Sequence, residues 1–387
     1  MIQKAFKYRL YPNKIQEQKI NQNMGCVRYI YNLALETKIK AYEKDGKTLS
    51  CFDLITGLLK KEKAEKDWLK QPYSQCLQMS LRNLDNAFTG FFKKKSSFPK
   101  FKKKSNRQYC QFPQNIKVDT DNNKVYFPKI GWIKTKLSRK FEGKIKTSTL
   151  SKTTTGKFFV SILVETSQNI PEKPEIEHKT SVGIDLGIKS YIVTSKGEEA
   201  KYPKFLKKTL NRIKILHKRA SKHPKRGLRR RKAMRKVALK YEKVRNQRQD
   251  WLHKLSSKLI SENQTICLEN LNVAGMVKNH KLAQSISDCS WSTFTSFLDY
   301  KAEWYGRNIL RIGRFEPSSK MCSNCGWMKK DLTLADREWK CEDCDVVHNR
   351  DVNAAINIKK FALLKQNTGS GGPGELQGAN MLVSKPR

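Results

Sequence analysis

The chain has 387 residues, enough to bury more than one hydrophobic core, and its 79 lysines and arginines against 35 acidic residues give a formal net charge of +44. Such an excess makes the chain repel itself unless a polyanion is its usual partner, which favours nucleic acid. A membrane surface is the alternative partner, but no apolar run approaches the length of a spanning helix.

The N-terminal residues and the cysteines bear on localisation. The first twelve residues interleave charged and apolar side chains, which is not the pattern of a signal peptide. Ten cysteines, six of them scattered without ligand spacing, fit reduced thiols in a reducing compartment. A cytoplasmic, nucleoid-associated protein is therefore expected.

The first 178 residues contain a strand, a helical region and a second group of strands. Residues 2–10 alternate apolar and charged side chains, and Tyr11-Pro12-Asn13 ends this predicted strand. From Lys14 to about Lys95, apolar residues recur at helical spacing. Short β-rich runs follow between Tyr109 and Thr166, and we expect the first strand to pair with them. Ile170–Lys179 is predicted to be a linker.

Two segments combine features that suit nucleic acid. Phe98–Lys104 mixes aromatic rings with lysines, so it offers stacking surfaces and phosphate-binding charge, although a solvated connector has a similar composition. Residues 204–260 carry roughly twenty lysines and arginines and bend at Lys225-Arg226-Gly227, which predicts a basic helical hairpin. The alternative for this second segment is a fully solvated charged hairpin.

Three acidic residues occupy special places in predicted elements. Asp185 lies on a strand that turns at Gly187, and Glu269 ends the short strand that starts at Thr265. After a helix from Trp291 to Tyr305 and one more strand, the last helix starts beside Asp351. Each acid taken alone is typical of a turn or a helix cap. Beyond the last helix, a Gly/Ser/Pro-rich tail from Asn367 onward has too few apolar residues to fold.

Four cysteines between the last strand and the last helix have metal-ligand spacing. They form two C-x-x-C pairs, Cys322/Cys325 and Cys341/Cys344, separated by fifteen residues. Four thiolates can close a tetrahedron around Zn²⁺, and the spacer is long enough for one small hairpin, as in a zinc ribbon. Redox activity or disulfide bonding is the alternative. Gly326 follows the first pair, but Asp345 follows the second, which is expected to weaken that turn without removing a ligand.

Taken together, the acids match the order strand-Asp, strand-Glu, helix-Asp of a ribonuclease-H-like nuclease core, in which the acids converge at one end of a mixed sheet. Three converging carboxylates repel one another, and two Mg²⁺ ions would relieve this repulsion and support phosphodiester hydrolysis.

The motifs G-I-D185-L-G, L-E269-N-L and H-N-R-D351-V-N-A-A-I-N-I, with the cysteine pairs between the last two acids, resemble the TnpB (OrfB) family of insertion-sequence transposons. The resemblance extends to the N-terminal K-A-F-K-Y-R-L-Y-P and to R-Q-D-W-L-H-K-L. Members of this family are RNA-guided DNA nucleases related to type V CRISPR effectors.

The resemblance implies a multidomain α+β fold in which a RuvC-type nuclease core carries an inserted zinc ribbon, beside a split wedge-like β-barrel and a helical recognition lobe. It makes Asp185, Glu269 and Asp351 the Mg²⁺ ligands and the four cysteines the Zn²⁺ ligands. It also implies a guide RNA from the transposon end and a double-stranded DNA target with a short flanking motif, bound by a monomer. The expected domains are the wedge (1–13 and 106–178), the helical lobe (14–105), the nuclease core (179–318 and 349–366), the ribbon (319–348) and a disordered tail (367–387).

Three other functions remain open. A DDE transposase would carry its acids in the order Asp, Asp, Glu, and a single-strand transposase needs a His-x-His pair that the six histidines do not form. A catalytically silent RNA-guided repressor is expected to have lost one acid, whereas all three are present. A zinc-ribbon nucleic-acid binder without catalysis would leave the acids unexplained.

Overall fold

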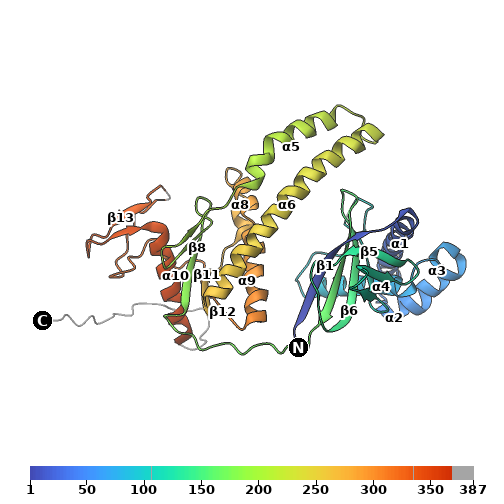
Figure 1. Ribbon diagram of the computed structural model, residues 1–387, viewed down its shortest axis with the longest axis horizontal. Helices are drawn as coiled ribbons and strands as arrows, with labels where there is room; N and C mark the ends of the chain where they lie inside the picture. The colour runs from blue at the N-terminus through green and yellow to red at the C-terminus, as the bar shows by residue number, and fades with distance from the viewer. Residues whose placement is uncertain (106, 334, 368–387) are drawn as a thin grey trace. The chain divides into compact units, whose positions relative to one another are not determined.

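A computed structural model of the chain describes residues 1–105, 107–333 and 335–367, which fall into two compact units (Figure 1). Unit 1 is Met1–Asn169, and unit 2 begins at Ile170. The tail predicted from Asn367 onward lies outside the described residues, apart from Asn367 itself, which ends a helix. None of the described helices has the length and apolar character that a bilayer crossing requires.

Unit 1 combines an antiparallel sheet with a group of helices, as the sequence predicts. Its elements in chain order are β1 (Gln3–Tyr11), α1 (Lys14–Asp45), α2 (Cys51–Asp53), a π-helical turn η1 (Leu54–Leu59), α3 (Lys60–Glu65), a 3-10 turn η2 (Asp67–Leu69), α4 (Ser74–Phe92), β2 (Gln108–Phe112), β3 (Lys117–Asp119), β4 (Lys124–Phe127), β5 (Gly131–Lys136), β6 (Lys144–Lys152) and β7 (Phe158–Glu165). The strand order is β2-β6-β7-β1-β5-β4-β3.

The first strand of unit 1 lies in the middle of this sheet. β1 pairs antiparallel with β5 and with β7, which confirms the predicted pairing of the first strand with the later block. Alternate residues of β7 from Phe158 to Val164 are buried, and they share one core with α1 and α4. β2 and β3 are the two edge strands of this sheet, and in its described part they do not pair with each other.

Unit 2 is built on a mixed sheet of five strands. Its elements are β8 (Ser181–Leu186), β9 (Ile192–Thr194), β10 (Glu199–Ala200), α5 (Phe205–Ser221), α6 (Leu228–Glu262), β11 (Thr265–Glu269), α7 (Val273–Met276), α8 (Ala283–Cys289), α9 (Trp291–Tyr305), β12 (Asn308–Ile312), β13 (Glu338–Lys340), β14 (Val347–Asn349) and α10 (Arg350–Asn367). The strand order is β10-β9-β8-β11-β12. β8, β11 and β12 are parallel, whereas β9 runs antiparallel to β8.

Helices cover both faces of this sheet, which explains why its strands are nearly continuous apolar runs. Ile266 and Leu268 of β11 pack with residues of α6 and α9 on one face. The intervening Cys267 packs with Ile358 of α10 on the other face. Figure 1 shows α10 and α6 on opposite sides of β8 and β11.

Gly183 allows α10 to lie directly against β8. A Cβ atom at Gly183 would overlap the carbonyl oxygen of Ala355 and would come within 2.9 Å of the Cβ atom of Lys359. Because these neighbours include backbone atoms, they cannot rotate away. The missing side chain therefore sets the position of α10, the helix whose first turn carries Asp351.

We expect Gly183→Ala to destabilise unit 2 by about 2–3 kcal/mol, the usual range for overpacking a tight contact. Gly25→Ala is a matched control, because a Cβ atom there meets nothing within 4 Å, and this substitution within α1 should be neutral or slightly stabilising. Differential scanning calorimetry of both variants tests the prediction. Equal melting temperatures would contradict the close approach of α10 to β8.

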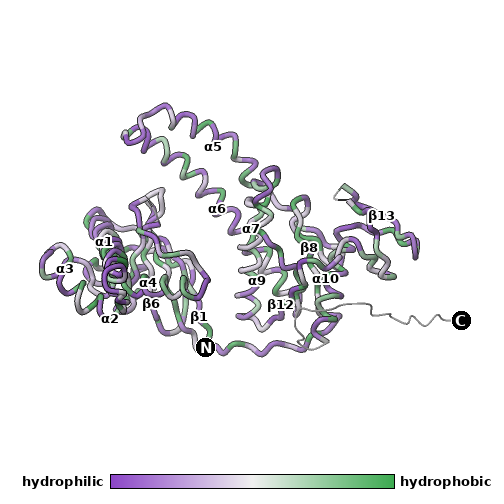
Figure 2. The backbone as a smooth tube through the Cα atoms, turned by 180° about the vertical axis from the view of Figure 1, so that it is seen from behind, coloured by the Kyte–Doolittle hydropathy of each residue, from purple (hydrophilic) through white to green (hydrophobic). Residues whose placement is uncertain are grey.

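Helices α5 and α6 form a long hairpin, here called the arm, which is the basic hairpin that the sequence predicts. Hydrophilic residues, purple in Figure 2, predominate along the arm. A partly buried ion pair fixes its base: Arg248 Nη2 of α6 lies 2.6 Å from Asp288 Oδ1 of α8. The hydroxyl of Tyr202 also donates to Asp288, and Trp251 packs edge-on against Tyr191.

Candidate metal sites

Asp185 and Glu269 lie side by side at the carboxyl ends of two parallel strands. The register pairs Leu268 of β11 with Ile184 of β8, so Asp185 and Glu269 are the next residues along the two strands. Both side chains are half-buried. The Glu269 carboxylate accepts a 2.6 Å hydrogen bond from the hydroxyl of Ser318, a buried residue just before the cysteine-rich segment.

Asp351 is the second residue of α10. The side chain of Asn349 caps this helix, since its Oδ1 accepts hydrogen bonds from the backbone N–H groups of Asp351 and Val352. Arg337, from the segment between the cysteine pairs, lies 3.4 Å from Asp351 Oδ2. The backbone of Arg337 is held in place by a hydrogen bond from Arg350 N to the carbonyl oxygen of Arg337.

Electrostatics connect the three acids. Burial raises the pKa of Asp185 to about 7, and the negative charges of Glu269 and Asp351 add to the rise. Arg350 opposes it. The carboxylates that the sequence predicts as a group are therefore near enough to influence one another, as expected where carboxylates share a site.

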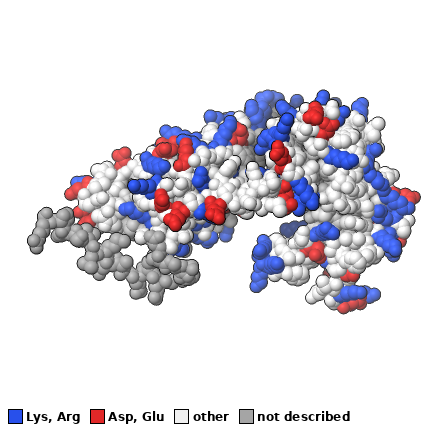
Figure 3. Space-filling view, turned by 60° about the horizontal axis from the view of Figure 1, so that its bottom comes forward, with Lys and Arg blue, Asp and Glu red and all other residues white. Residues whose placement is uncertain are grey.

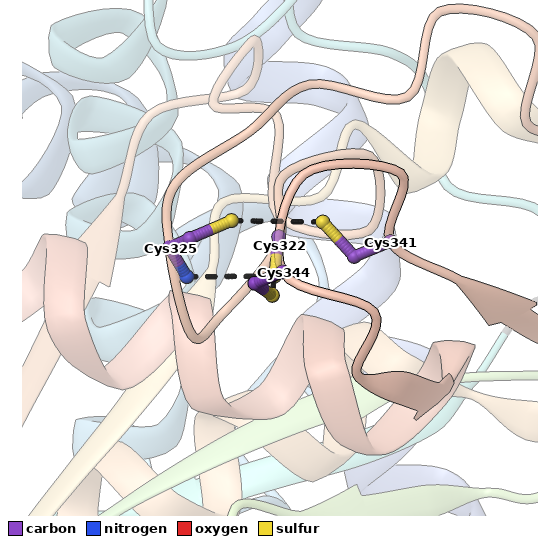
Figure 4. A group of neighbouring side chains, drawn as sticks. All are labelled: Cys322, Cys325, Cys341 and Cys344. Carbon is purple, nitrogen blue, oxygen red and sulfur yellow. Dashed lines mark hydrogen bonds between the residues drawn. The ribbon is translucent and has the colours of Figure 1, made fainter.

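The four cysteines form a metal-sized group. The sulfur atoms of Cys322 and Cys344 are 3.7 Å apart, and those of Cys325 and Cys341 are 3.5 Å apart (Figure 4). A tetrahedral site with Zn–S bonds of about 2.3 Å has S···S edges of about 3.8 Å. The donor set and the spacing therefore fit Zn²⁺. Within the described ranges, no other set of three or more His, Cys, Asp or Glu ligand atoms converges as closely, the three acids included.

The two cysteine pairs form turns with the same hydrogen bonds. Gly326 N donates to the carbonyl oxygen of Cys322, and Asp345 N donates to that of Cys341. Gly326 has φ +87° and Asp345 has φ +57°, so Asp345 adopts the left-handed conformation that favours glycine. The prediction of a hairpin inside the fifteen-residue spacer is wrong: β13 pairs instead with β14, and the second cysteine pair lies in the connection between them. The turn of the second pair itself reverses the chain.

We expect Asp345→Gly to stabilise the ribbon by up to about 1 kcal/mol, because glycine adopts a positive φ without the steric cost of a Cβ atom. The substitution also removes the ion pair between Lys340 and Asp345, but an exposed pair contributes little. Zinc affinity measured by competition with a chelator checks this. A weaker affinity than that of the wild type would contradict the strain assigned to Asp345.

Several residues of these sites were not predicted from the sequence. Ser318 and Arg337 contact Glu269 and Asp351, and the imidazole of His348 lies 3.0 Å from the Cys322 sulfur. His348 is buried against Trp339 in the small core of the ribbon. The only sequence signal for them is their position, since Ser318 and His348 lie just outside the two cysteine pairs.

The tip of the arm forms a cationic cavity of about 360 Å³ with no carboxylate in its lining. The cationic and imidazole groups around it are Arg212, Arg219, His223, Arg229, Lys232 and Lys236. Clustered like charges repel one another, so this cavity is suited to an anionic ligand. Lysines and arginines also spread over the visible face of the molecule (Figure 3).

The aromatic and basic segment after α4 is only partly a surface. Phe98 and Phe101 are about half exposed, and Phe98 packs edge-on against Phe88. Lys102, by contrast, lies with its ammonium 3.5 Å from the centre of the Tyr31 ring, and burial lowers its pKa to about 8. Lys102 therefore has a structural role inside unit 1.

The fold agrees with a solved structure. The chain of Cas12f1 in the cryo-EM structure of a Cas12f1–sgRNA–target DNA complex superposes with a TM-score of 0.57 and 15% identity, over 92% of this chain and 98% of that one. Together with the four-cysteine cluster, this defines a multidomain α+β protein with the Cas12f1 fold. A family profile described as “Cas12f1-like, TNB domain” matches residues 291–358.

Two other family profiles match earlier parts of the chain. The profile “Probable transposase” of the IS605 OrfB proteins matches residues 161–280, and a “Helix-turn-helix domain” of the same family matches residues 1–47. In this chain residues 1–47 contain strand β1 and one continuous helix, α1.

Two curated relatives extend over nearly the full length. A “Putative RNA-guided DNA endonuclease” of Streptomyces pristinaespiralis is 37% identical over 374 residues, covering 96% of this chain and 92% of the relative. “Putative RNA-guided DNA endonuclease InsQ” of Escherichia coli K12 is 29% identical over 370 residues, covering 92% and 91%. The chain belongs to the TnpB (IS605 OrfB) family, which confirms the resemblance found in the sequence.

Proposed function

We propose that this protein is an RNA-guided, Mg²⁺-dependent DNA endonuclease that cuts double-stranded DNA complementary to its guide, beside a short flanking motif. The observation that carries the proposal is the pair Asp185 and Glu269 at the carboxyl ends of two parallel strands, with Asp351 in the first turn of α10, where the charges of Glu269 and Asp351 both act on Asp185. The names of its relatives support the choice of substrate.

The chain's own residues have distinct roles in this proposal. Asp185, Glu269 and Asp351 would hold Mg²⁺ as oxygen ligands, and the ions would activate the attacking water and stabilise the leaving oxygen. Ser318 orients Glu269 through its hydroxyl. Arg337 lies beside Asp351, and in this proposal its guanidinium would bind a phosphate oxygen of the DNA.

The same proposal assigns a role to each of the two units. Unit 2 would be the RuvC-like nuclease core with its zinc ribbon, and unit 1 the wedge-like sheet with a helical recognition lobe. The net charge of +44 suits a chain that holds an RNA and a DNA together. One site would cut both strands in turn, and the working complex would contain one copy of the chain.

The RNA that co-purifies with the protein provides the test. The protein is expressed beside its native flanking DNA, and the bound RNA is sequenced. One discrete species ending in variable sequence is the expected result, and it supplies the guide for a cleavage assay with and without Mg²⁺. A mixture of cellular RNA that dissociates in salt would overturn the guided function and leave an unguided nuclease or transposase to be tested.

A silent RNA-guided repressor is the second candidate, and the same assay distinguishes it. Such a protein would retain the discrete RNA and bind the matching DNA without cutting it. The presence of all three acids favours the nuclease. Strand transfer, to which the wording of one family profile refers, would join DNA ends rather than release them.

A further inference from the structure

The segment between β12 and the first cysteine pair contacts the acid site and leads directly into the cysteine cluster. Ser318 lies four residues before Cys322 and is buried. Its hydroxyl donates to Glu269 Oε1 at 2.6 Å, the length of a strong hydrogen bond to a carboxylate. Its backbone carbonyl accepts a 2.8 Å hydrogen bond from the side chain of Asn357 on α10. Ser318 thus joins β11 to α10.

Two asparagines of α10 hold the start of the ribbon. The amide groups of Asn353 and Asn357 both donate to the carbonyl oxygen of Met321, at 2.8 and 2.6 Å. The Asn353 Oδ1 atom accepts from the backbone N–H of Ser323, at 2.8 Å. Both asparagines are almost completely buried and lie one helical turn apart, so they face the same way. Asp351 lies in the first turn of the same helix.

We infer that Ser318 is a positioning residue for Glu269, and that Asn353 and Asn357 fix Ser318 so that the zinc ribbon and the acid site share one hydrogen-bonded junction. This inference rests on the proposed function, because it assigns Glu269 as a metal ligand. A carboxylate free to rotate loses conformational entropy when it binds an ion, whereas one already held by Ser318 has lost it beforehand. The hydroxyl occupies one carboxylate oxygen and leaves the other available to the ion.

The experiment measures metal affinity directly and does not depend on cleavage. Mn²⁺ serves as the probe, and electron paramagnetic resonance of the free ion reports its binding to the full-length protein. Binding elsewhere is subtracted with the Asp185→Asn variant. We expect Ser318→Ala to weaken this binding by about tenfold or more, the usual cost of losing a hydrogen-bond partner of a metal ligand. Zinc content and melting temperature should stay close to wild type.

Two further variants separate positioning from a general structural role. Ser318→Thr keeps the hydroxyl and should restore affinity for Mn²⁺. Ser319→Ala removes the neighbouring hydroxyl, which does not contact Glu269, and should behave as wild type. An Mn²⁺ affinity of Ser318→Ala within about twofold of wild type would overturn the inference. Equal Mn²⁺ binding by the wild type and by Asp185→Asn would also overturn the inference.

Failure of the proposed function is recognised separately. If the RNA-loaded wild type binds Mn²⁺ at the acids but does not cut matching DNA, the proposed nuclease function is wrong. The role of Ser318 is then judged from the Mn²⁺ affinities of the variants alone. If the wild type cuts, Ser318→Ala should need about tenfold more Mg²⁺ for half-maximal cleavage, while its affinity for target DNA is unchanged.

Discussion

Replacing Asp185 by Asn should lower DNA cleavage by about 1000-fold or more, a loss comparable to that of other principal catalytic groups. Asparagine keeps the size of the side chain but removes the negative charge that a Mg²⁺ ion requires. Binding of guide RNA and target DNA should stay within a few-fold of wild type, because the substitution removes no phosphate-binding cation. A cleavage assay with a matched filter-binding assay measures both quantities.

Asp299→Asn is the control for this substitution, because Asp299 is an exposed aspartate that pairs with Arg311 and is not one of the three acids. It should cut at the rate of the wild type. If Asp185→Asn also cut at that rate, the assignment of the site would be wrong. A parallel loss of DNA binding would instead indicate that Asp185 supports the fold of the binding surface.

Although Asp185→Asn should abolish cleavage, it should stabilise the folded protein when no Mg²⁺ is bound. Burial and the neighbouring acids raise the pKa of Asp185 from 3.8 to about 7. The folded protein therefore binds a proton that the unfolded chain has lost, so the wild type becomes less stable as pH rises from 3.8 towards 7. Asparagine does not ionise. In a buffer without added Mg²⁺ and without a chelator, so that the zinc stays bound, the Tm of Asp185→Asn should exceed that of wild type by a margin that grows over this range and then levels off.

The double variant Cys322→Ser, Cys325→Ser should lose its zinc and unfold the ribbon. Binding of structural Zn²⁺ supplies about 10 kcal/mol or more of folding free energy in small zinc domains, and the buried core here contains little beyond Leu332 and Trp339. Cleavage should be lost as well, because Arg337 and Ser318 reach the acids from this segment. Metal analysis and limited proteolysis of residues 319–348 measure the two effects.

Cys51→Ser provides the matched control. Cys51 is a half-buried thiol in unit 1 that lies outside the cysteine cluster. It should keep both zinc and cleavage. Retention of one zinc ion per chain by the double variant, or an unchanged proteolysis pattern, would contradict a structural metal held by the four cysteines.

The sequence predicted the main elements of both units because side-chain periodicity is a local property. The helix predicted from Trp291 to Tyr305 has those bounds in the structure, and the strand expected to end in Glu269 does so. β-rich runs flanked by turn residues likewise located the strands of unit 1. The four cysteines could be predicted as a group because their spacing is itself the signal. The three acids were singled out by their order along the chain, and their role as metal ligands stays a prediction.

The contacts between distant segments could not be predicted. Gly183 resembles any glycine in a strand, and only the approach of α10, formed by residues far along the chain, explains it. Ser318 and Arg337 acquire their roles from side chains that the fold brings to them. The prediction of a hairpin within the spacer was wrong for a related reason. The turn of the second cysteine pair itself reverses the chain between β13 and β14, so no separate hairpin is needed.

The central place of β1 in unit 1 affects the order of folding. The ribosome makes β1 first, but its partners are residues 134–136 of β5 and 158–165 of β7, so both of its edges stay open until nearly the whole unit has been synthesised. Contacts of such long sequence separation form slowly, and an unpaired strand is prone to aggregate. The helices made in between cannot be excised as an independent module, because their apolar faces pack on the sheet that closes last.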